Sequence, residues 1–309
     1  MDNKLEIKPF NDFWMNCELN NMLSILCSVN NTYRKCAYLN SYKYYLYEPK
    51  ELCKGIDVYR NDLYEFIDRY VEVVPYDFLN QETIIDEIIE KICEGTPIGI
   101  AVDLYHWLPN TIIYQKKHWY HYSMIVGVDQ LKNEFIILDE DNQGYREHRV
   151  TKDKVIKAFL PNVMESQAII FRMKYNKISD YSIDNKNIIQ YSKKIIESID
   201  TIPEVIWDNE LGREKEQAIK MMIASTSRIY NCQISNKFLL KELFDEKKKM
   251  YNDLYEILEF NEKSWRNIHN YLMKIDMLCG EIDYEKINKM SRKCLNYEKD
   301  FWCNLLLEM

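Results

Sequence analysis

The uneven distribution of glycine and proline constrains the fold more than any other feature of the 309-residue sequence. Six of the seven prolines lie at or before Pro161, and five of the seven glycines lie at or before Gly144. Because these residues mark turns and end helices, we expect the first half to be mixed α/β and the second half to be helical. The stretch 175–183, YNKISDYSI, is the best junction, so the sequence predicts two domains, residues 1–178 and 179–309.

Hydrophobic spacing predicts the elements of the first half. Residues 16–29 and 80–95 have the three- and four-residue spacing of helices. Residues 121–129 and 133–141 are apolar runs separated by a short polar turn, which is typical of a hairpin. The predicted fold class is therefore α+β, with an antiparallel sheet followed by an all-α domain. Further predicted elements are strands at 96–105 and 166–175, and helices near 185–200, 204–232, 236–260, 262–279 and 283–307.

Composition excludes several functional classes. The net charge is −8 and the pI about 5.4, whereas nucleic-acid binders usually carry a basic excess. The apolar runs are too short to span a bilayer, so no membrane partner is expected. The nine cysteines contain no CxxC pair and have irregular spacing, which indicates free thiols in a reducing cytoplasm.

Cys17 stands immediately before a helical apolar pattern in the stretch NCELNNMLSIL. The N-terminus of a helix presents unpaired backbone N–H groups and a positive dipole end, which lower the pKa of a thiol and favour a thiolate. This position suits a nucleophile. Free cysteines are also among the most buried residues, so a structural thiol is the alternative. Asn11, six residues upstream, and the adjacent Asn16 are candidates to complete an oxyanion hole.

His121 begins the predicted strand 121–129, and Asp139 lies at the end of the next one. In a hairpin the start of one strand lies beside the end of the next, so these residues are expected to be neighbours although 18 positions separate them. A carboxylate beside an imidazole fixes its tautomer and orientation. Glu140 and Asp141 compete with Asp139 for this role.

His118 and His121 also form an H-x-x-H pair, which suggests a metal site as an alternative. Two imidazoles make a poor site, and residues three apart on a strand point to opposite faces, so no metal is expected. His106 would have to fold back as a third ligand. His106, His148 and His269 are expected to be surface or core histidines.

Aromatic residues cluster around the predicted catalytic strand, and they fit either a hydrophobic core or an acyl or aryl pocket. Trp107, Trp119 and Tyr120 are the candidate substrate-binding residues within this group, which also contains Tyr105 and Tyr122.

The order of these residues resembles that of papain-like cysteine enzymes: a cysteine opening the first main helix, a histidine at a strand start, and an aspartate ending the following strand. The likeness is greatest to the bacteriocin-leader peptidase-like branch. Within it, the segments VDLYHWLPN, HWYHYSMIVGVD and FIILDED look like the butirosin-type acyltransferase group. The amide-forming cysteine-protease homologue of closthioamide (polythioamide) biosynthesis is a related possibility. The resemblance covers roughly residues 8–175.

This resemblance implies a papain-like N-terminal domain and an amide-forming acyltransferase of natural-product (antibiotic) biosynthesis. Such enzymes move an acyl chain from the phosphopantetheine thioester of a carrier protein to a small amine, with no other cofactor bound. It also implies that Cys17 is the nucleophile, His121 the general base and acid, and Asp139 the orienting group. Asn11 matches the place of the usual oxyanion glutamine, but its side chain is shorter.

Two alternatives to the transferase remain open. The same triad suits a cysteine hydrolase, either a peptidase or a thioesterase, which would pass the acyl group to water. A non-catalytic binding module that retains the fold is the third hypothesis.

Overall fold

The computed structural model describes residues 2–39, 42–47, 54–159, 166–208, 215–246 and 248–309. The chain forms two compact units, one of Met1–Arg34 and Tyr64–Tyr181 and the other of Lys35–Leu63 and Ser182–Met309. The single boundary predicted after residue 178 therefore needs a correction. The change of unit at 181/182 lies near it, but Lys35–Leu63 joins the helical unit because its strands pack against helices α6 and α7 described below.

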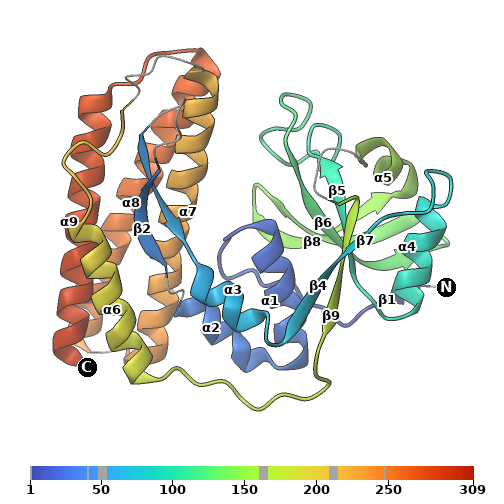
Figure 1. Ribbon diagram of the computed structural model, residues 1–309, viewed down its shortest axis with the longest axis horizontal. Helices are drawn as coiled ribbons and strands as arrows, with labels where there is room; N and C mark the ends of the chain where they lie inside the picture. The colour runs from blue at the N-terminus through green and yellow to red at the C-terminus, as the bar shows by residue number, and fades with distance from the viewer. Residues whose placement is uncertain (1, 40–41, 48–53, 160–165, 209–214, 247) are drawn as a thin grey trace. The chain divides into compact units, whose positions relative to one another are not determined.

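The first unit is built on a sheet in which all pairs of neighbouring strands are antiparallel (Figure 1). Within the described residues the strand order is β4-β9-β5-β6-β7-β8, and β1 pairs with β6. The strands are β1 (Asp2–Lys4), β4 (Val71–Tyr76), β5 (Ile98–Asp103), β6 (Tyr120–Asp129), β7 (Glu134–Asp141), β8 (Gly144–Thr151) and β9 (Ala168–Met173).

The predicted β6–β7 hairpin is confirmed. Asp129 pairs with Glu134, and the register continues to Met124 opposite Leu138 after a bulge between Ile125 and Gly127. Gly127 suits this place, because an added Cβ would lie 3.0 Å from the carbonyl oxygen of Asn3 in β1 and would crowd that backbone. The sequence did not predict β8, whose outward side chains are charged, so its hydrophobic alternation is weak.

Helices cover this sheet. Helix α4 packs Ile84, Ile88 and Ile92 into a core with apolar side chains of β5, β6 and β7. Helix α1 contacts β4, β6, β7 and β9, and Tyr145 of β8 donates a hydrogen bond to Asn21 of α1, with an O···O distance of 2.5 Å. The helices of this unit are α1 (Cys17–Val29), α4 (Ile84–Cys93), α5 (Lys152–Ala158) and the 3-10 helix η1 (Asn31–Tyr33). Short helices α2 (Arg34–Tyr38) and α3 (Asn61–Ile67) lie where the chain passes between units.

The second unit contains long helices and the hairpin of β2 (Lys43–Tyr47) and β3 (Gly55–Tyr59). The helices are α6 (Asn185–Asp200), α7 (Lys215–Leu243), α8 (Lys249–Leu278) and α9 (Tyr284–Glu308). The sequence prediction was wrong about two helix breaks, near 233–235 and at 261, which lie inside α7 and α8. Buried polar residues caused this error: Ser235, for example, donates to the carbonyl oxygens of Ala37 and Tyr38 instead of ending a helix. Part of the predicted helix 204–232 lies outside the described residues.

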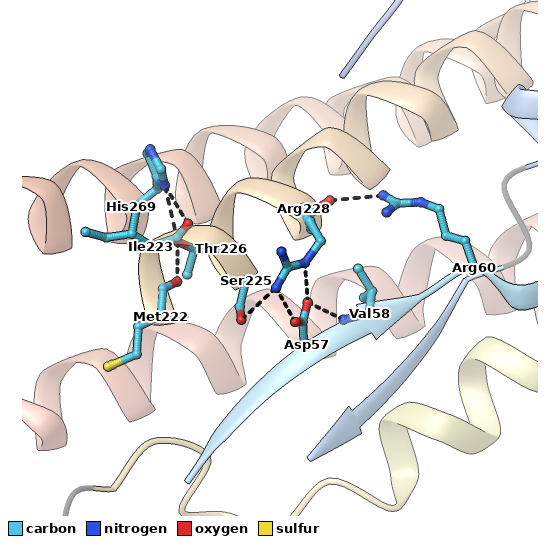
Figure 2. Close-up of polar contacts among 9 residues, drawn as sticks. All are labelled: Asp57, Val58, Arg60, Met222, Ile223, Ser225, Thr226, Arg228 and His269. Atoms are coloured by element: carbon cyan, nitrogen blue, oxygen red, sulfur yellow. Dashed lines mark hydrogen bonds and ion pairs between the residues drawn. The ribbon is translucent and has the colours of Figure 1, made fainter. Parts of the chain in front are cut away.

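Polar contacts fasten the β2–β3 hairpin to the helices of its unit. Figure 2 shows Arg228 of α7 paired with both carboxylate oxygens of Asp57 in β3, with Ser225 beside it. A further contact drawn in Figure 2 joins the two helices to each other: Nδ1 of His269 in α8 faces the carbonyl oxygen of Ile223 in α7. The two charges of the Asp57–Arg228 pair compensate each other at a nearly buried position, since Asp57 is 5% exposed.

No helix in these described ranges is both long and apolar enough to cross a membrane.

Candidate active site

Cys17 is the first residue of α1, and Asn16 is the N-cap. The side-chain oxygen of Asn16 accepts from the backbone N–H of Leu19 at 2.8 Å, and its amide nitrogen donates to the hydroxyl of Tyr64 at 2.8 Å. Asparagine is a favoured N-cap because it satisfies one of the unpaired N–H groups of the first turn. Asn16 therefore positions the cysteine, and these contacts give its side chain a capping role instead of the predicted oxyanion role.

Asn11, the other predicted oxyanion residue, is exposed. Its side-chain oxygen accepts a hydrogen bond from Arg34 at 3.2 Å. Arg34 also forms an ion pair with Asp12, with an N···O distance of 2.5 Å. The amide is thus oriented by a partly buried arginine, and the prediction that Asn11 contributes to an oxyanion hole has no support from its contacts.

Two backbone N–H groups, those of Tyr122 and Glu18, form hydrogen bonds to the sulfur of Cys17 instead. Burial raises the pKa of the thiol to about 11, while hydrogen bonds from the backbone N–H groups of Tyr122 and Glu18 act to lower this pKa. The negative charges of Asp139 and Glu18 raise it further. The lowered pKa expected from the helix N-terminus is therefore wrong, because desolvation outweighs the local N–H groups. Tyr122 directly follows His121, so this contact brings the sulfur to the strand that carries the predicted base.

His121 and Asp139 lie together as predicted. Nε2 of His121 is 3.2 Å from Oδ2 of Asp139, and both side chains are largely buried. Burial acts to lower the pKa of His121, but the charge and hydrogen bond of Asp139 more than offset it, so this pKa is raised. Burial likewise acts to raise the pKa of Asp139, but His121 and hydrogen-bond donors lower it overall. Asp139 thus stabilises the imidazolium that forms when His121 takes up a proton, and Nδ1 is the ring nitrogen that does not face Asp139.

The neighbouring acids have other environments. Asp141 pairs with Arg146, which lowers the pKa of its carboxyl group against the effect of burial. Burial and the adjacent charge of Asp139 raise the pKa of Glu140 to about 7. Among the three candidate acids, Asp139 is the one that forms a hydrogen bond with His121.

Trp107 was predicted to bind substrate, and the structure corrects this role. Its side chain is fully buried, and its indole N–H donates to Oδ2 of Asp139 at 2.6 Å. The other oxygen, Oδ1, accepts from the backbone N–H of Glu140 at 2.7 Å. Trp107 therefore holds the carboxylate from inside the protein. The sequence signal was an aromatic residue in the β5–β6 connection, but the sequence does not reveal that its N–H reaches a residue of β7.

Trp119 and Tyr120, the other two predicted substrate-binding residues, are 43% and 40% exposed. They immediately precede His121 at the start of β6, so the structure leaves them accessible beside the candidate base.

A second histidine–aspartate pair joins the two ends of the β5–β6 connection. The sequence analysis did not predict this pair. Nδ1 of His118 lies 2.6 Å from Oδ2 of Asp103, and the ring of His118 stacks on Tyr105 with centroids 4.5 Å apart. The side chain of His118 is 58% exposed, whereas that of His121 is 12% exposed. The backbone N–H of Leu104 donates to the carbonyl oxygen of Trp119 at 2.8 Å in the same place. We interpret the His118–Asp103 pair as a contact that holds the two ends of this loop together.

The metal alternative gains no support. Within the parts of the chain that the structure describes, no group of three or more His, Cys, Asp or Glu residues is placed to hold a metal ion.

The raised pKa of Cys17 predicts slow alkylation at neutral pH. A thiol with a pKa of about 11 is ionised in about one molecule in 10⁴ at pH 7, so the rate of reaction with iodoacetamide should rise about tenfold per pH unit up to about pH 9. Mass spectrometry of the Cys17 peptide measures this rate, and Cys17→Ala protein identifies labelling of the exposed Cys93 and Cys279. A rate that is already at a plateau below pH 7 would contradict the raised pKa.

Trp107→Phe tests the contact with Asp139. Loss of the indole N–H leaves the carboxylate charge less dispersed, so we expect its pairing with imidazolium to strengthen and the pKa of His121 to rise. The titration of His121 by NMR gives this pKa. Trp119→Phe is the matched control because Trp119 is exposed, and it should leave the titration of His121 unchanged. If the unmodified protein and both variants gave the same titration curve, Trp107 would have no effect on the pKa of His121.

Comparison with known proteins does not assign a family. No protein-family model matches the chain. A MATH and LRR domain-containing protein of Plasmodium falciparum (isolate 3D7) is 27% identical over 274 residues, which cover 88% of this chain and 2% of that protein. The chain thus spans a very small part of the relative that it matches.

Proposed function

We propose that this protein is a papain-like cysteine acyltransferase that forms an amide bond. The observation that carries the proposal is a hydrogen bond from the backbone N–H of Tyr122, the residue after His121, to Cys17 at the N-terminus of α1, together with the hydrogen bond between His121 and Asp139. A nucleophile, a base and a group that orients the base are the three parts that covalent acyl transfer requires.

The first half-reaction transfers the acyl group to the protein. The sulfur of Cys17 attacks the thioester carbonyl of a carrier-bound chain while Nδ1 of His121 takes the thiol proton. Backbone N–H groups at the start of α1 stabilise the oxyanion. The bond between the carbonyl carbon and the phosphopantetheine sulfur then breaks, and His121 returns the proton to the leaving thiolate. The raised pKa of Cys17 favours this concerted route, since the resting thiol is protonated.

The second half-reaction releases an amide. An amine attacks the carbonyl of the acyl-enzyme, His121 removes the amine proton, and the proton passes to the departing sulfur of Cys17. The exposed Trp119 and Tyr120 offer an apolar surface for the acceptor beside His121.

Intact-mass measurement tests the proposal. Incubation with an acylated carrier protein should increase the mass of the chain by the mass of the acyl group, and the adduct should map to Cys17. Addition of a small primary amine should discharge the adduct to an amide faster than water discharges it to an acid. The adduct could instead discharge to the acid at the same rate with and without amines, and the protein could cleave peptides. These two results would show that the protein is a cysteine hydrolase and not a transferase. A chain that never forms an adduct would instead be a binding module.

A further inference from the structure

Three fully buried side chains of the helical unit have hydrogen-bonding atoms without a partner among the described residues. The atoms are Oε1 of Gln233 in α7, both amide atoms of Asn261 in α8, and Nε1 of Trp265 in α8. Each of these residues is 0% exposed. A buried donor or acceptor that remains unpaired costs about 1–3 kcal/mol, and native proteins pair nearly all such groups.

The contacts between α7 and α8 place these residues at one level of the unit. Lys237 follows Gln233 by one helical turn and contacts Glu259 and Glu262 of α8, at N···O distances of 2.6 and 2.5 Å. Those two glutamates stand on either side of Asn261 in the sequence. Gln233 and Asn261 are therefore about one turn apart along the packed pair of helices.

Helix α9 reaches the same level. The rings of Phe260 and Tyr297 lie 4.5 Å apart, and these residues immediately precede Asn261 and Glu298. Nε2 of Gln233 donates to Oε2 of Glu298 at 2.6 Å. These contacts place the three residues within about one helical turn of each other along α7 and α8, with α9 packed at the same level. Trp265 lies on the same face as Asn261 because four residues separate them.

The chemistry of the unpaired atoms specifies the ligand. Asn261 offers an amide NH₂ group with two donor hydrogens and a carbonyl oxygen, Trp265 offers one N–H donor, and Gln233 offers a carbonyl oxygen. The carboxylate of Glu298 is already engaged, because Tyr42 and Tyr44 also donate to it. The site therefore presents both donor and acceptor atoms and no free charge. This set does not suit an ion, and an apolar molecule would leave all four atoms unpaired.

We propose that Gln233, Asn261 and Trp265 bind internal water in the core of the helical unit. Water is the small molecule whose two donor and two acceptor positions match these groups, and buried waters typically make about three hydrogen bonds to otherwise unpaired polar atoms. The proposal concerns the helical unit alone and does not depend on the proposed acyl transfer.

A crystal structure of the full chain that shows ordered solvent is the direct test. We expect solvent density within about 3.2 Å of at least two of the three side chains. Side chains that have turned to pair with each other, with no solvent between them, would overturn the proposal. Density for a bound molecule larger than water would also overturn it.

A stability comparison gives a second test that needs no crystals. Trp265→Phe and Trp207→Phe each remove one indole N–H and the same side-chain volume. Both positions are fully buried in the helical unit. Trp207 serves as the control because its N–H donates directly to Ser291 at 2.8 Å. If water satisfies Trp265, both variants should lose similar amounts of urea resistance. A clearly smaller loss for Trp265→Phe would show that its N–H has no partner to lose and would refute bound water there.

Discussion

Replacement of Cys17 by alanine is expected to abolish acyl transfer without unfolding the protein. The sulfur is the atom that carries the acyl group in the proposed mechanism, so no other residue can substitute for it. In enzymes with a comparable triad, loss of the nucleophile reduces kcat by about 10⁶-fold. The helix itself should persist, because Asn16 still caps it and alanine is a strong helix former.

The rate of amide formation and the intact mass after thioester treatment measure this effect. Cys303→Ala is the matched control, since Cys303 is also a partly exposed free cysteine but lies in α9. The control should retain both the rate and the adduct. An adduct that persists in Cys17→Ala would move the nucleophile to another residue, and a retained rate without any adduct would exclude covalent cysteine catalysis.

The second large effect is expected for His121→Ala. General acid–base catalysis contributes about 10²- to 10⁴-fold, and here the base must also remove a proton from a thiol whose pKa is raised to about 11. We therefore expect at least a 100-fold slower formation of the acyl-enzyme. The burst of released phosphopantetheine thiol in a single-turnover experiment measures this step.

His118→Ala is the control for that experiment, because His118 also contacts a carboxylate but is much more exposed than His121. We expect this substitution to loosen the β5–β6 connection and to lower the rate less than tenfold. A tenfold decrease corresponds to a rise of about 1.4 kcal/mol in the activation free energy. A large loss in His118→Ala with near-normal turnover in His121→Ala would reverse the two roles.

The sequence could predict the His121–Asp139 pair because a hairpin is a local structure. Its turn is short, its strands alternate in character, and its pairing follows from residues within about twenty positions. The α+β class and the helical second half were predictable for a similar reason, since glycine and proline act on the chain near them.

The contacts that could not be predicted join residues from distant elements. Trp107 reaches Asp139 across the sheet, and nothing in the local pattern shows whether a buried indole N–H finds a carboxylate. The pKa of Cys17 was predicted with the wrong sign because it depends on desolvation, which only the packed structure determines. Likewise, Asn16 and Asn11 were equivalent amides in the sequence, and their different contacts assign one to the helix cap and the other to Arg34.

The insertion of Lys35–Leu63 into the helical unit has a consequence for synthesis on the ribosome. The hydroxyls of Tyr42 and Tyr44 donate to Glu298, which lies 256 and 254 residues later in the chain. At about 5–20 residues per second, the ribosome takes about 13–50 seconds to make that interval. During this time the hairpin exposes tyrosines whose native partner does not yet exist. The helical unit therefore completes its core only after α9 has been made, and a truncation before α9 would leave the early hairpin permanently without this contact.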